Sequence, residues 1–148
     1  MKAQKFLISC MVVVLFFVAG FVLIKSPPAK NIYVKIAGQV LKVELATTSE
    51  EQARGLSARQ GLAEDEGMLF VFDRPSKYHF WMKDMNFAID IIWLSEDMHM
   101  IYIKKNAEPS SYPETFVPNQ NAKYVLEVVS GFSDKNNLKE GDILEFLP

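Results

Sequence analysis

The pattern of hydrophobic residues divides the chain into an apolar N-terminal segment and a longer part in which apolar and polar positions alternate. Residues 6–24 contain no charged side chain, and Lys2 and Lys5 precede them. A run of this length is close to the ~20 residues that a helix needs to cross the hydrocarbon core of a membrane. It is apolar on every side, whereas a helix on a soluble core would show one apolar stripe. We therefore expect residues 1–25 to form one N-terminal apolar helix, a membrane anchor or signal segment.

Two interpretations of this segment remain open, an uncleaved anchor and a secretory signal peptide. Ala19 and Gly20 offer a weak cleavage site, but the apolar run continues past them to Ile24, which favours the anchor. Lysines flank the run on both sides and do not settle its orientation, whereas a large C-terminal domain translocates largely regardless of charge. We expect a single-pass cell-membrane protein whose globular domain lies outside the cytoplasm, in the periplasm or the extracellular space. Secretion after cleavage of a signal peptide is the alternative.

The rest of the chain consists of a short linker and one globular domain. Residues 26–30 include Pro27 and Pro28, which stop a helix and stiffen the spacer. The domain comprises residues 31–148, and its apolar positions alternate with polar ones in the way that is typical of half-buried strands. This pattern predicts strands at residues 32–37, 39–46, 67–72, 78–82, 87–94, 99–103, 124–129 and 143–146.

The connections between these strands carry cap and turn residues. Thr47, Thr48 or Ser49 is suited to cap a helix that ends near Gly55. We predict a turn at residues 73–76, a long irregular loop with three prolines at 108–121 and a short helical turn at 131–137. Seven or eight short strands with one or two short helices predict a mainly β (α+β) fold, a compact single-domain β barrel or sandwich.

Composition and charge exclude several classes of function. The 148-residue chain has one cysteine, Cys10, inside the apolar run, so the domain has no disulfide, thiol nucleophile or cysteine metal cage. Residues 31–148 carry 12 Lys and Arg against 18 Asp and Glu, a net charge of −6. An acidic domain of this kind argues against nucleic acid as a partner.

No strong catalytic or metal-binding motif is present. The chain lacks a P-loop, a GxSxG elbow, an HExxH pair and a dinucleotide fingerprint. Methionines cluster with both histidines and suggest Cu(I) ligation, but neighbours in a strand point to opposite faces, which separates them. We therefore predict no metal and no cofactor, and interpret the methionines of both groups as core packing. The two groups are His79, Met82 and Met85, and Met98, His99 and Met100.

Charged residues inside apolar strands are the most informative feature. Asp90 lies within residues 87–94 and Glu127 within residues 124–129. A carboxylate buried without a partner costs several kcal/mol, so each must be paired, reach solvent at a pocket or lie on an exposed face. Structural ion pairs are the commoner outcome of such a pattern.

A tryptophan accompanies these charges. Alternation places Trp81 on the same strand face as Lys83, which is unusual for a pure core strand and is compatible with a pocket wall. We single out as a candidate ligand pocket the residues Arg59, Trp81, Lys83, Asp90 and Glu127.

Four ordered blocks of the sequence carry a resemblance to a known family. The blocks are Glu44-Leu45-Ala46 with Glu50-Glu51-Gln52, Gly55-Leu56 and Arg59; Gly67–Phe72; Phe80–Lys83 with Ile89–Ile91; and Tyr124–Val128 with Gly131 and Gly141-Asp142. Together they resemble the prokaryotic domain of unknown function 192 (DUF192), over about Val40 to Leu147, and Ser57 departs from it where the family usually carries methionine. The resemblance implies a small β fold and frequent export or anchoring, and it supplies no reaction.

These observations favour a binding module over an enzyme. We expect a small envelope domain, membrane-anchored or secreted, that binds a small molecule or an envelope protein without catalysis. The alternative is a carbohydrate-active hydrolase or lyase in which Asp90 and Glu127 act as an acid–base pair, which requires both carboxyls within ~10 Å in one cleft. A purely structural domain is the third hypothesis. The sequence alone identifies no catalytic residue.

Overall fold

The computed structural model describes residues 31–148. The predictions of an N-terminal apolar helix at 1–25 and a linker at 26–30 lie outside these described residues. Within them, no helix has the length and apolarity that crossing a membrane would require.

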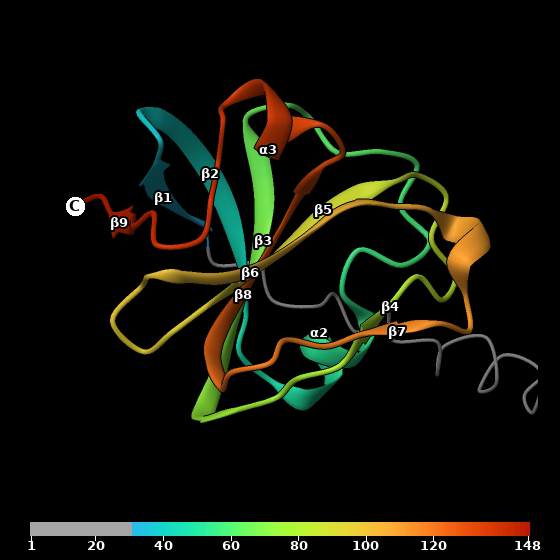
Figure 1. The fold of residues 1–148 in the computed structure, drawn as a ribbon. Helices are drawn as coiled ribbons and strands as arrows, with labels where there is room; N and C mark the ends of the chain where they lie inside the picture. Colours follow the sequence, from blue (N-terminus) through green and yellow to red (C-terminus); the bar gives the residue numbers. More distant parts are fainter. Residues whose placement is uncertain (1–30) are drawn as a thin grey trace, which may run out of the picture.

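One curled seven-stranded sheet forms the body of the domain, and Figure 1 shows it bent into a half-barrel. Its strand order is β6-β5-β8-β3-β2-β1-β9; β2 and β3 are parallel and all other neighbours antiparallel. An isolated bridge from His99 to Ile143 links the β6 edge to the β9 edge. The mainly β prediction is confirmed. The strands are β1 (Asn31–Ile36), β2 (Gln39–Ala46), β3 (Glu66–Ser76), β5 (Ile89–Leu94), β6 (Met100–Ala107), β8 (Ala122–Val129) and β9 (Leu144–Phe146).

A second, two-stranded sheet corrects the prediction of an irregular loop at 108–121. β7 (Thr115–Phe116) forms inside that segment and pairs with β4 (Phe80–Trp81). A short 3-10 helix, η1 (Pro109–Ser111), precedes β7. Trp81 lies opposite Thr115 in the register of these two strands. The segment at 108–121 therefore pairs with the backbone that carries Trp81.

The central strands β5 and β8 are buried on both faces, which explains their nearly continuous apolar sequence. Alternate residues contribute to two separate core clusters. Leu126 and Val128 belong to one, together with Phe132 of helix α3 (Phe132–Lys135). Val125 belongs to the other, together with Leu56, which follows helix α2 (Ser49–Arg54). Figure 1 places α3 and α2 at opposite ends of the half-barrel.

Helix α2 begins and ends where the cap residues predict. Thr48 is the N-cap, and its side chain forms a capping box with Glu51. Gly55 ends the helix with φ of +49°, a conformation that favours glycine. The Gln52 side chain donates hydrogen bonds to the carbonyls of Ala46 (3.3 Å) and Val71 (2.9 Å), which fixes the short helix to β2 and β3.

Strand β3 is longer than its apolar run predicts. The predicted turn at 73–76 lies within it, and its register with β8 shifts between Val71 and Ser76. An irregularity of this kind bends a strand without ending it. The bend carries the chain past α2 and toward β4.

Candidate functional site

A cavity of about 190 Å³ lies between α2 with the turn that follows it, β3 and the segment that leads into β4. It opens on the side of the domain where Figure 1 places α2, β4 and β7. Its lining is mostly apolar and aromatic, with a few polar groups, a mixture that is typical of ligand pockets. The residues that line it are Gln52, Ala53, Arg54, Gly55, Leu56, Ser57, Phe70, Phe72, Tyr78, His79, Phe80, Trp81, Met85 and Glu127.

Aromatic rings form the walls of this cavity and support one another. The rings of Phe72 and Tyr78 stack with centroids 3.5 Å apart and an interplanar angle of 10°. Phe80 meets Phe70 edge to face at 4.9 Å. Trp81 remains 48% exposed although it lines the cavity, so its ring is available to a ligand. Contacts between the rings hold these walls in position before anything binds.

Glu127 of β8 is the acidic group of the cavity. Only 5% of this residue is exposed, and its Oε2 atom is buried without a hydrogen-bond partner. Burial raises the pKa of Glu127 to about 8, although the charge of Arg59 acts in the opposite direction. The carboxyl is therefore largely protonated at neutral pH. An unsatisfied buried polar atom is rare in folded proteins, and this one belongs to a residue that lines a cavity.

Gly55 lies against the aromatic wall and close to this carboxyl. A Cβ at residue 55 would lie 3.3 Å from the Phe70 ring, a tight contact, and 3.8 Å from Glu127 Oε2, an ordinary van der Waals contact. The positive φ that ends α2 and the close approach of the backbone to Phe70 both favour glycine here.

Arg59 lies near Glu127 but binds another carboxylate. Its guanidinium donates hydrogen bonds of 2.6 and 2.8 Å to the two carboxylate oxygens of Glu44. This contact lowers the pKa of Glu44, chiefly through the hydrogen bond from Arg59. Glu44 lies opposite Met68 of β3, and Met68 lies opposite Glu127 of β8, so the two glutamates occupy one row across the sheet.

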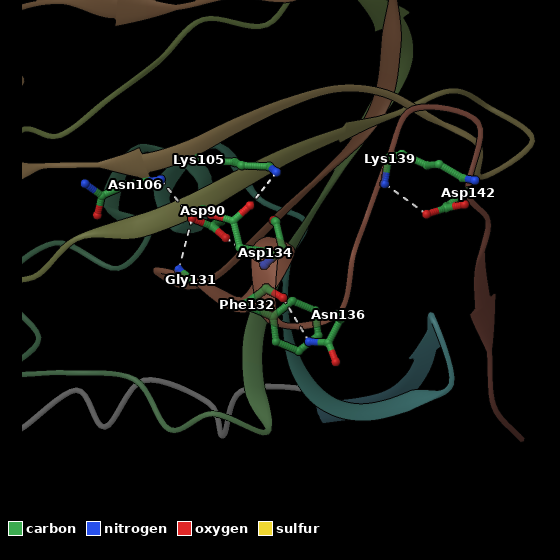
Figure 2. A network of polar contacts seen from close by, with 10 residues as sticks. Asp90, Lys105, Asn106, Gly131, Phe132, Asp134, Asn136, Lys139 and Asp142 are labelled. Atoms are coloured by element: carbon green, nitrogen blue, oxygen red, sulfur yellow. Dashed lines mark hydrogen bonds and ion pairs between the residues drawn. The ribbon is translucent and has the colours of Figure 1, made fainter.

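Asp90 lies on the other face of the sheet. Ile91 is paired with Glu127, and successive residues of a strand face opposite ways, so Asp90 and Glu127 diverge. The Asp90 carboxylate accepts backbone hydrogen bonds from Asn106 (2.8 Å), Gly131 (3.3 Å) and Ser133 (2.8 Å). Figure 2 shows it enclosed between the β6 strand and the start of α3. Asp90 therefore fixes α3 to the sheet and does not reach the cavity.

The structure thus brings together only part of the predicted pocket. Trp81 and Glu127 line the cavity, and Arg59 acts on Glu127 by its charge. Lys83 does not line the cavity; its side chain is exposed, while its backbone carbonyl accepts a 3.0 Å hydrogen bond from Ser57. Trp81 and Lys83 are both exposed, as their alternation predicts, but only the tryptophan lines the cavity together with Glu127.

Sequence reasoning missed most of the cavity wall. Phe70 and Phe72 are two residues apart on β3, so they share a face, and that spacing was an available signal. Tyr78 and His79 gave no comparable signal, because the segment before β4 is not regular strand. His79 lines the cavity, although it is not among the five residues predicted to form the pocket. Within residues 31–148, no group of three or more His, Cys, Asp or Glu is arranged to hold a metal ion.

Comparison with known proteins identifies a family and a fold. The model of the DUF192 family, described as "Uncharacterized ACR", matches residues 32–146. A protein of unknown function from Novosphingobium aromaticivorans DSM 12444 is 31% identical, with a TM-score of 0.76 over 82% of this chain and 89% of that one. A protein from Sinorhizobium meliloti 1021, described as a "putative transcription regulator", is 28% identical, with a TM-score of 0.76 over 82% of this chain and 97% of that one. None of the curated proteins matches the chain. The family model covers nearly all of the described residues, and the chain therefore belongs to the DUF192 family.

Proposed function

We propose that residues 31–148 form a non-catalytic ligand-binding domain and that the cavity beside Glu127 is its binding site. The observation that carries this proposal is that Glu127, whose Oε2 atom has no hydrogen-bond partner, lines a cavity walled by aromatic rings. A group of this kind destabilises the empty protein, since a buried polar atom without a hydrogen bond costs about 1–3 kcal/mol. Natural proteins keep such a cost mainly where function requires it.

The positions of the carboxyls favour binding over acid–base catalysis. A glycosidase needs two carboxyl groups that flank one bond of the substrate. Asp90 faces the opposite side of the sheet from Glu127 and is occupied by three backbone N–H groups. Glu44, the other carboxylate in the row, is held by Arg59. Glu127 therefore has no second carboxyl with which to share a reaction.

The size of the cavity limits the ligand. A cavity of about 150 Å³ lined by apolar side chains holds one benzene ring. The cavity here, of about 190 Å³, has room for one ring with a short substituent. We infer that the ligand, or the part of it that enters, is a single ring or an aliphatic group of similar size.

We further propose that the domain works outside the cytoplasm, attached to the membrane by residues 6–24. The absence of charge across those residues supports an anchor. The relative from Sinorhizobium meliloti is described as a putative transcription regulator, but the net charge of −6 on residues 31–148 opposes binding to a polyanion. A small molecule or a group on an envelope protein suits the cavity better than nucleic acid does.

A thermal-shift screen of single-ring compounds against the full chain tests the binding proposal. Compounds that bind the folded state raise the melting temperature by mass action. The rise should disappear in Trp81→Ala, which removes a cavity wall, and persist in Tyr33→Ala, which removes an equally exposed aromatic ring on β1 (48% and 53% exposed). If no single-ring compound stabilises the chain, or if both variants respond alike, the cavity is not a binding site.

A further inference from the structure

We propose that the ligand of this cavity is an organic cation, a protonated or alkylated amine whose positive head group lies beside Glu127 and between the aromatic rings. This inference rests on the proposed binding function and adds the chemical class of the ligand. The Glu127 carboxyl and the rings of Phe72, Tyr78, Phe80 and Trp81 carry it.

The first step concerns what Glu127 lacks. Its Oε2 has no hydrogen-bond donor in the described part of the chain. The nearest cationic influence, Arg59, has its guanidinium engaged by both oxygens of Glu44. An ammonium group would supply both the donor and the positive charge that the carboxyl is missing, and a charge-assisted hydrogen bond of this type is about twice as strong as a neutral one.

The second step concerns the walls. Aromatic faces attract cations through their quadrupoles, and cages of such rings recognise quaternary ammonium groups. Here a stacked pair, Phe72 on Tyr78, and three further rings, those of Phe70, Phe80 and Trp81, line the same cavity as the carboxyl. A neutral ring would gain only apolar contact from these walls, whereas a cation gains electrostatic attraction from both the walls and the carboxyl.

Several titratable and charged groups surround Glu127. Arg54 on α2 and His79 before β4 line the cavity, and Arg59 and Glu44 form their own pair beside it. Lys104 of β6 lies over the ring of Phe116, 4.6 Å from its centroid. Because burial raises the pKa of Glu127 to about 8, this carboxyl releases a proton when a cation binds beside it at neutral pH. Arg54 at the cavity lining is suited to meet an anionic or polar outer end of the ligand.

The test compares two probes of equal size, phenethylamine and phenethyl alcohol. Both have one ring and the same number of heavy atoms, and only the amine is charged. Isothermal titration calorimetry uses the full chain in phosphatidylglycerol nanodiscs, which carry no ammonium group, with empty nanodiscs as the reference. We expect the amine to bind about tenfold more tightly than the alcohol. Its affinity should rise by up to about tenfold for each pH unit between pH 6 and pH 8, since binding then requires loss of the Glu127 proton.

Two variants separate the proposal from its alternatives. Glu127→Gln should lose most of the amine's advantage and the pH dependence, retaining only the attraction of the aromatic rings, whereas Glu145→Gln, which removes one exposed carboxylate from β9, should behave as the unaltered chain. If the alcohol binds at least as tightly as the amine, the cavity is a ligand site but the cation is the wrong class. If the amine keeps its full advantage and its pH dependence in Glu127→Gln, the cation is held elsewhere. If neither probe binds, the proposed binding function and the proposed ligand class are both wrong.

Discussion

The guanidinium of Arg59 is hydrogen-bonded to Glu44, through contacts of 2.6 and 2.8 Å, and not to the neighbouring carboxyl of Glu127. The negative charge of Glu44 therefore offsets much of the field that Arg59 exerts on Glu127. This arrangement leaves burial as the main influence on the pKa of Glu127, which it raises to about 8.

Replacing Glu44 by Gln should consequently lower the pKa of Glu127. The positive charge of Arg59 would remain near Glu127 without a carboxylate to offset it, and an uncompensated cation favours the ionised carboxyl. A pH titration of the Glu127 carboxyl carbon by NMR measures the change. Glu145→Gln, which is distant on the β9 edge, should leave the titration unchanged. An unaltered midpoint in Glu44→Gln would mean that Arg59 does not influence Glu127.

The two buried carboxyls should respond differently to replacement by an amide. Asp90→Asn should destabilise the folded chain by about 2–3 kcal/mol, because a charged acceptor of three backbone N–H groups becomes an amide with only one oxygen. Glu127→Gln should cost nothing or increase stability at neutral pH, since no partner is lost. Urea unfolding of both variants makes the comparison. Equal destabilisation would show that Glu127 is a structural group like Asp90.

The stability of the chain should fall as pH rises from about 4.5 to about 8. The pKa of Glu127 is about 8 in the folded state against an ordinary value of 4.5. Between these values the folded state retains a proton that the unfolded state has lost, so raising the pH favours unfolding until both states are ionised. The loss across this window is on the order of 3–5 kcal/mol. Glu127→Gln should lack this slope, and a variant that keeps the full slope would assign it to other groups.

The sequence predicted the framework of the sheet well and the cavity poorly, for a physical reason. Strand positions follow from local alternation and from glycine and cap residues, such as Thr48 and Gly55 around α2. The cavity depends on contacts between segments far apart in the chain, such as the pairing of β4 with β7 and the stacking of Tyr78 on Phe72. Asp90 shows the same limit. Its charge marked it as exceptional, but only the register reveals that it faces away from Glu127.

A chain that begins at Asn31 should be soluble, monomeric and cooperatively folded. β1 begins at that residue and is paired on both sides, with β2 and with β9, so the described domain contains its own sheet partners. Removal of the apolar residues 6–24 should therefore leave the fold intact. Thermal unfolding by circular dichroism and sedimentation analysis provide the check. Aggregation, or melting without a cooperative transition, would mean that the N-terminal residues belong to the core.

The titration of the Glu127 carboxyl itself, with and without ligand, tests the central claim most directly. The claim is that this carboxyl lacks a partner in the empty domain and gains one from a molecule in the cavity. The carboxyl carbon of Glu127, followed by NMR in the free chain, should titrate with a midpoint of about 8. Saturation with a compound from the thermal-shift screen should move that midpoint, downward for a cation and upward for a neutral hydrogen-bond acceptor. A midpoint near 4.5 in the free chain, or one that stays fixed at saturation, would contradict the account.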